Sequence, residues 1–249
     1  MGALISRRGV GAYWLCALAL LLLPARAAAA PVLGAQTRQL VVVTSAAWPA
    51  TTGTLRRFER RRDGAWHAVG AEHAVALGEA GLGWGAGDDP ARGRAPDEPR
   101  KREGDRRAPA GVFALEGAFG DGAPPPGTRL AYRAIADLIC VDDPAAPDYN
   151  RVLPRGVARA HRSHETLAGV KDYALGVVVA HNRAPVRAGA GSCVFLHLGA
   201  PATPTVGCTA MPRDVLAELV AWLDPAAAPR LVQLPREVYR SRRGSWGLP

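Results

Sequence analysis

Short apolar segments separated by polar, glycine and proline residues run along most of this chain. Residues 39–45 are apolar and β-branched, which predicts a first buried strand. Strand-like character returns at residues 112–115 and 130–139. Residues 173–180 and 193–198 are two apolar segments separated by a polar loop, and we expect both to be core strands. Many short strands with few helices predict a mainly β domain.

Helical periodicity is clear in one place only. Leucine and valine recur at helical spacing over residues 212–223, and Pro225 ends the pattern. A short helix is also predicted over residues 160–167, and a second strand near residues 65–69. Residues 78–107 are rich in glycine, proline and charge without a hydrophobic period, which predicts a long loop.

The first thirty residues have the features of a secretory signal peptide. Arg7 and Arg8 precede an apolar run at residues 11–23, and small residues follow it. No later stretch reaches the roughly 20 apolar residues of a membrane helix. We therefore expect export to the periplasm or cell wall, with no stable membrane insertion after cleavage of residues 1–30. An uncleaved signal would instead tether the domain to the membrane.

The remaining chain has the length of one domain. We expect residues 31–240 to form it and residues 241–249 to form a C-terminal tail. The formal net charge is +9, and the basic residues are dispersed, with the densest run at residues 56–62 predicting a solvated face. Because basic and aromatic residues do not alternate, we expect anionic wall polymers as contacts and no nucleic acid. Nothing in the sequence indicates an oligomeric state.

Removal of the signal would leave three cysteines, since Cys16 lies in its apolar run. An odd number leaves one thiol unpaired unless a partner chain supplies a second one. A Cys140–Cys193 disulfide would leave Cys208 free. Alternatively, Cys193 is a small hydrophobic residue, or Cys208 is an inert thiol or a disulfide partner.

Candidate chemistry concentrates in residues 191–211, with the sequence GSCVFLHLGAPATPTVGCTAM. His197 is expected near the end of a strand, and a proline-containing loop returns the chain to Gly207 and Cys208. Acyl transfer by a thiol needs a neighbouring imidazole to remove its proton. Backbone N–H groups around Gly207, Cys208 and Thr209 are candidates for binding an oxyanion. The alternative is that His197 is a core histidine bonded to a backbone carbonyl.

These residues resemble a known family. The element Thr205-Val206-Gly207-Cys208 after a strand histidine is similar to the signature of the YkuD-type L,D-transpeptidase catalytic domain. The segments KREGDRRAPAGVFAL (101–115), CVDDPAAPDYN (140–150) and HNRAP (181–185) extend the resemblance over most of the chain. It implies an L,D-transpeptidase-like β-sandwich with a few short helices, one of them after the nucleophile. It also implies acyl transfer on peptidoglycan stem peptides through a Cys208 thioester, with His197 as base.

The chain departs from the family pattern at two positions near the nucleophile. Ala210 stands where an arginine is common, so the substrate contact usually made by that arginine is missing. Val206 stands where some branches have a histidine. Both departures concern the choice of acyl donor or acceptor, and neither removes the nucleophile or the base.

Five further residues are candidates for binding substrate. Asp105 and Thr205 are expected near the cleft, although a surface turn explains Asp105 almost as well. Tyr149, His181 and Asn182 either hold substrate or orient the base, or they form a polar network that supports loops.

The functional expectation is therefore a cell-wall enzyme that cross-links stem peptides and so contributes to cell shape. An L,D-carboxypeptidase that trims the same stems, and a non-catalytic wall-binding protein, remain alternatives. No metal is expected, because the sequence has no CxxC or HExxH and its histidines are scattered. No cofactor is expected either, because no glycine-rich nucleotide-binding fingerprint occurs.

Overall fold

The computed structural model describes residues 1–2, 32–89 and 94–249. Within these residues the chain forms thirteen strands and two α-helices. The strands are β1 (Gln39–Ser45), β2 (Thr52–Arg60), β3 (Trp66–Ala76), β4 (Leu82–Trp84), β5 (Ala108–Gly120), β6 (Tyr132–Ala134), β7 (Leu138–Val141), β8 (Val152–Pro154), β9 (His164–Thr166), β10 (Leu175–Val179), β11 (Phe195–Leu198), β12 (Thr209–Met211) and β13 (Arg230–Pro235). The helices are α1 (Arg213–Trp222) and α2 (Arg236–Trp246). The prediction of a mainly β fold is confirmed. The predicted signal peptide, from residue 3 onward, lies outside the described residues.

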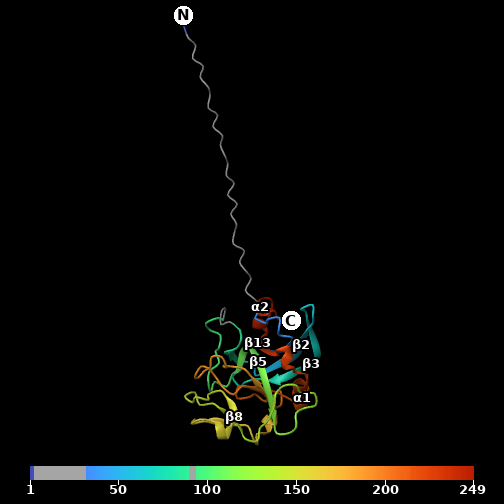
Figure 1. The fold of residues 1–249 in the computed structure, drawn as a ribbon, viewed down its shortest axis with the longest axis vertical. Helices are drawn as coiled ribbons and strands as arrows, with labels where there is room; N and C mark the ends of the chain where they lie inside the picture. Colours follow the sequence, from blue (N-terminus) through green and yellow to red (C-terminus); the bar gives the residue numbers. More distant parts are fainter. Residues whose placement is uncertain (3–31, 90–93) are drawn as a thin grey trace.

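The main sheet closes on itself. Its strand order is β10-β11-β12-β3-β2-β1-β13-β5, and β10 also pairs with β5, so the sheet is barrel-like. Strands β4 and β6 add to β5. In Figure 1, β5 and β13 lie side by side in the body of the molecule, and α2 lies at one end.

Strand β1 lies at the centre of this sheet. It pairs with β2 on one side and runs parallel to β13 on the other. Leu40, Val41 and Val43 are fully buried, which explains why the sequence here is continuously apolar instead of alternating. The strand predicted at residues 39–45 is confirmed.

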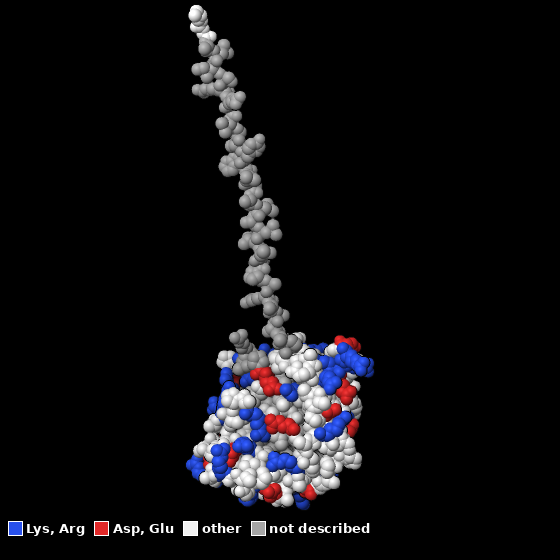
Figure 2. Space-filling view, in the orientation of Figure 1, with Lys and Arg blue, Asp and Glu red and all other residues white. Residues whose placement is uncertain are grey.

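The densest basic run lies partly in β2. The prediction that this run is solvent-exposed is wrong for Arg57. Alternation along the strand exposes Arg56 and turns Arg57 inward, where only 4% of its side chain is exposed. The Arg57 guanidinium pairs with the carboxylate of Glu218 on α1 at 2.5 Å and lies over the Trp222 ring. Elsewhere, basic and acidic side chains are interspersed over the visible face (Figure 2).

A second, three-stranded sheet has the order β8-β7-β9, and in Figure 1 β8 lies at the end of the molecule opposite α2. The helix predicted over residues 160–167 is wrong, because this segment contains β9. Glu165 of β9 pairs with Cys140 of β7, so cross-strand hydrogen bonding overrides the local helical preference.

The long loop predicted at residues 78–107 contains one short strand. Leu82, Gly83 and Trp84 form β4, which runs parallel to the start of β5. Three residues are too few for a periodic pattern to reveal a strand. The Trp84 ring packs against Trp48 and Trp246, with centroids 5.4 and 6.3 Å away.

Two helices lie after Cys208 in the chain. Helix α1 confirms the pattern seen at residues 212–223 and buries its leucine and valine face. The expected tail at residues 241–249 is instead part of the fold, because it contains the end of α2. Trp246 and Leu248 are buried in the core. None of the helices in the described ranges is long and apolar enough to cross a membrane.

A disulfide joins the two sheets. Cys140 lies in β7 of the small sheet, and Cys193 lies two residues before β11 of the main sheet. Their pairing was one of the alternatives from the sequence, and it is confirmed. Cys208 is free and buried. The disulfide therefore fixes the small sheet against the segment that leads to His197.

Replacing Trp246 tests whether the end of the chain belongs to the core. We expect Trp246→Ala to lower the free energy of unfolding by about 3–5 kcal/mol, because a buried ring is removed and a cavity remains. Chemical denaturation followed by circular dichroism measures this loss. The neighbouring exposed Ser245→Ala is the matched control and should change stability by less than about 0.5 kcal/mol.

Removing the disulfide tests how strongly it holds the two sheets together. The bond closes a loop with a sequence separation of 53 residues. We expect Cys140→Ser with Cys193→Ser to lower the free energy of unfolding by about 2–4 kcal/mol, because the unfolded chain regains entropy. Equal denaturant midpoints of the double variant and the parent would contradict this expectation.

Candidate active site

A cavity of about 690 Å³ lies between the two sheets. The small sheet contributes Glu165 from β9 and Asp142, which directly follows β7. The main sheet contributes His197 from β11 and Cys208, which directly precedes β12. The predicted nucleophile and base therefore lie in the wall of one cavity.

His197 is held on β11 with only 6% of its surface exposed. Its Nδ1 lies 2.8 Å from the backbone oxygen of Leu198. A carbonyl oxygen only accepts hydrogen bonds, so Nδ1 carries the proton and Nε2 keeps a free lone pair. Burial lowers the pKa of the imidazole below its ordinary value of 6.5. At neutral pH His197 is therefore an uncharged base, and the carbonyl bond expected of a core histidine is also present.

The Cys208 thiol is unpaired and 9% exposed. Its sulfur accepts a hydrogen bond from the Phe195 backbone N–H at 3.3 Å and donates one to the Cys193 backbone oxygen at 3.5 Å. Burial raises its pKa from 9.0 to about 12, and the Glu165 carboxylate acts in the same direction. The resting thiol is therefore protonated at neutral pH.

His197 lies on β11, and Cys208 directly precedes β12, which pairs with β11 in parallel; both residues line the cavity. His197 pairs with Ala210, two residues after the nucleophile. The Tyr173 ring packs edge-on against both the His197 and Phe195 rings, with centroids 5.4 and 5.6 Å away. In the described part of the chain no hydrogen bond joins Cys208 to His197, because the thiol is directed at Cys193. The resting pair is thus neutral and uncoupled.

The turn before the nucleophile is fixed by Thr205. Its hydroxyl donates to the Cys208 backbone oxygen at 2.7 Å and accepts from the Gly207 N–H at 3.1 Å. Gly207 has a φ of 148°, a conformation that favours glycine. Thr205 lines the cavity, and its hydroxyl proton is used within the turn.

The oxyanion donors expected from the sequence are placed differently. The Gly207 N–H donates to the Thr205 hydroxyl in the resting structure, and the oxyanion role of this group stays a prediction. Thr209 is buried, and its hydroxyl donates to the Gln233 side-chain oxygen at 2.7 Å. Cys208 and Ala210 line the cavity, whereas Thr209 between them does not, as alternation along a strand requires.

Asp105 and Tyr149 act behind the cavity wall. The Asp105 carboxylate accepts from the Lys101 ammonium at 2.6 Å and from the backbone N–H groups of Arg102 and Arg107. The buried Tyr149 hydroxyl donates to the Glu103 carboxylate. Lys101 and Glu103 line the cavity themselves, whereas Asp105 and Tyr149 do not. The two predicted residues thus position others.

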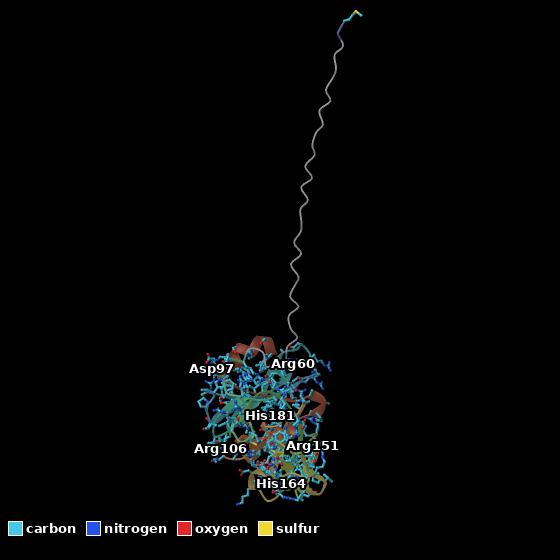
Figure 3. All side chains as sticks on the ribbon, turned by 90° about the vertical axis from the view of Figure 1, so that its left-hand side faces the viewer. Arg60, Asp97, Arg106, Arg151, His164 and His181 are labelled. Carbon is cyan, nitrogen blue, oxygen red and sulfur yellow. A yellow bond between two sulfur atoms is a disulfide. The ribbon has the colours of Figure 1, made fainter. Side chains whose placement is uncertain are left out.

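His181 and Asn182 form the loop-supporting network that was the alternative interpretation. Both are buried outside the cavity wall, and Figure 3 places His181 in the middle of the molecule. His181 donates from Nε2 to the Ala190 oxygen at 2.9 Å, and burial lowers its pKa to about 4. The Asn182 side chain bonds backbone groups of Arg187 and Gly191. Neither residue contacts the thiol or the His197 ring.

Several charged residues of the cavity wall were not identified from the sequence. They are Lys101, Glu103, Asp142, Glu165 and Asp172. The Oδ1 of Asp142 is buried without a hydrogen-bond partner, and burial raises the pKa of Glu165, which accepts from the Tyr173 hydroxyl. The first three lie within segments that carry the family resemblance. Glu165 and Asp172 lie outside these segments, and no sequence motif around them indicates that they line a cavity.

Comparison of the chain with protein-family models, curated proteins and solved structures finds no match. Among the residues that the structure describes, no group of three or more histidine, cysteine, aspartate or glutamate side chains is arranged to hold a metal ion. The site is therefore interpreted from its own chemistry.

The pH dependence of alkylation tests the protonation state of Cys208. We expect the rate constant with iodoacetamide to rise about tenfold per pH unit between pH 7 and 9, because only the thiolate reacts and its fraction grows tenfold per unit below the pKa. A plateau below pH 8 would contradict a thiol whose pKa is about 12. Cys208→Ser should not react, because the other described cysteines form the disulfide.

Proposed function

We propose that this protein is a cysteine-dependent acyltransferase, an L,D-transpeptidase that cross-links peptidoglycan stem peptides through a Cys208 thioester. The observation that carries the proposal is that a free thiol and an anchored, uncharged imidazole line the same cavity. The resemblance of residues 205–208 to the family signature supports the choice of substrate.

In the acylation step the Cys208 S–H turns from the Cys193 oxygen toward Nε2 of His197. The proton passes to Nε2 while the sulfur attacks the carbonyl carbon of the donor stem, at its diaminopimelate residue. The C–N bond then breaks, and the imidazolium returns the proton to the departing amine. Cys208 is left as a thioester and His197 as a neutral base.

In the second step an amine of another stem attacks the thioester carbonyl. The C–S bond breaks, and the proton lost by the amine passes through His197 to the sulfur. Water attacking in place of the amine would give an L,D-carboxypeptidase. The two reactions share every residue up to the thioester.

The charges of the cavity support a substrate that carries free amino groups. Four carboxylic acid side chains line the wall: Glu103, Asp142, Glu165 and Asp172. A buried carboxylate oxygen without a partner, such as Asp142 Oδ1, is costly unless a ligand satisfies it. Stem peptides and their acceptors supply ammonium groups that match this need.

The finer fold assignment and the location of the protein belong to the same proposal. The β-sandwich of the L,D-transpeptidases is supported by the mainly β chain and by α1 directly after the nucleophile strand. The closed main sheet differs from two separate layers, so the assignment rests on these local features. The Cys140–Cys193 disulfide supports an oxidising compartment such as the periplasm.

Incubation with a disaccharide-tetrapeptide tests the reaction. We expect mass spectrometry to detect cross-linked dimers, and we expect Cys208→Ala and His197→Ala to lower their formation by at least about 1000-fold and 100-fold. Shortened monomers alone would indicate the carboxypeptidase. Unchanged substrate would favour a wall-binding protein, and full activity of Cys208→Ala would exclude the nucleophile. Ser245→Ala, at an exposed position outside the cavity wall, is the control for folding.

The pH profile tests the base. His197 accepts a proton only when it is neutral, so kcat/KM should fall as the pH drops through the pKa of the imidazole. Because burial lowers that pKa, we expect the acid limb of the profile to lie below pH 6.5. An acid limb above pH 7 would contradict this assignment.

A further inference from the structure

Lys101 is a buried cation in the wall of the candidate active site. Only 5% of its side chain is exposed, and its stem passes close to Gly191, where an added Cβ would lie 3.0 Å from Lys101 Cε. The ammonium lies beside Gly207, since a Cβ on that glycine would be 3.7 Å from Nζ. Gly207 directly precedes the nucleophile, so the charge is held next to the site of attack.

Two of the three ammonium N–H groups are occupied. Nζ donates to the Asp105 carboxylate at 2.6 Å and to the Arg102 backbone oxygen at 2.8 Å. Within the described residues the third donor has no hydrogen-bond partner. Since Lys101 lines the cavity, this donor is available to a ligand there.

The other charged residues that line the cavity are all acidic. They disfavour an anion everywhere except near Lys101. Negative charge nevertheless develops during acyl transfer, when the carbonyl electrons move onto oxygen. Of the three backbone N–H groups expected to bind this oxygen, that of Gly207 is bonded to Thr205 and Thr209 lies outside the wall. Cys208 itself lines the cavity, so one of the three is left and a second donor would add to it.

We propose that Lys101 stabilises the oxyanion of this site. Its free N–H would donate a hydrogen bond to the oxygen that becomes negative when the Cys208 sulfur adds to a carbonyl carbon. This rests on the proposed acyl transfer. In the step the S–C bond forms, the carbonyl π electrons move to oxygen, and the thiol proton goes to His197. Lys101 keeps its own proton and only donates a hydrogen bond. Asp105 is a positioning residue that fixes the ammonium.

Two probes of Cys208 separate this role from an effect on the thiolate. Acylation by 4-nitrophenyl acetate places negative charge on a carbonyl oxygen, whereas alkylation by iodoacetamide forms no oxyanion. Both rates depend equally on the fraction of thiolate. The ratio of acylation to alkylation therefore reports on oxyanion binding alone.

We expect Lys101→Met to lower this ratio by about 100-fold, the usual loss when one oxyanion donor is removed. Lys101→Arg keeps a cation and should retain a larger ratio. Lys101→Met with Asp105→Asn removes both charges of the pair and provides a second variant if the single change unfolds the protein. Arg100→Met, at the exposed neighbouring position, removes the same charge and should leave the ratio within about twofold.

Equal losses of both rates in Lys101→Met would overturn the proposal, because Lys101 would then act on the thiolate only. Unchanged rates would overturn it as well. The probes do not depend on the natural substrate. If Lys101→Met lowers the ratio but stem peptides do not react with the parent protein, the role of Lys101 stands and the proposed function is rejected. If stem peptides react and the ratio is unchanged, the proposed function stands and the role of Lys101 is rejected.

Discussion

The parallel pairing of β11 with β12 is the constraint on which the candidate site depends. Parallel neighbours cannot be joined by a tight turn, so residues 199–208 must run back from the end of β11 to the start of β12. The returning segment is fastened at Thr205, whose backbone bonds Leu77 and Glu79 and whose hydroxyl bonds the Cys208 carbonyl. Because of this crossover, His197 and Cys208, eleven positions apart in the sequence, line the same cavity.

Burial acts on the two reactive groups in opposite directions with one result. It raises the pKa of the Cys208 thiol and lowers that of the His197 imidazole, so both are uncharged at rest. A buried thiolate and imidazolium would have to repay the loss of their hydration. In the proposed reaction the thiol proton would therefore move to His197 only when a carbonyl carbon is present to accept the electrons of the sulfur.

Features set by local pattern were predictable from the sequence, and those set by distant contacts were not. Strand β1 and helix α1 have strong apolar patterns, and both were predicted. Helix α2 is rich in arginine and is held by Trp246, so it resembled a polar tail. Cys208 and His197 were identified from a motif. Lys101 was not, because its position depends on Gly191 and Gly207, which lie far along the chain.

The charged residues of the cavity wall come from different parts of the fold. The small sheet, joined to the main sheet by the disulfide, brings acidic groups such as Asp142 and Glu165. Lys101 and Glu103 come from the segment before β5, and the Lys101 partner Asp105 stands outside the wall, so the ammonium is fixed in place by a carboxylate that does not line the cavity. In the proposed reaction a substrate would be oriented before any bond changes, with its carbonyl oxygen toward Lys101 and its amino groups toward the acidic side chains. Orientation of this kind lowers the entropic part of the barrier, because the reacting atoms no longer have to find each other.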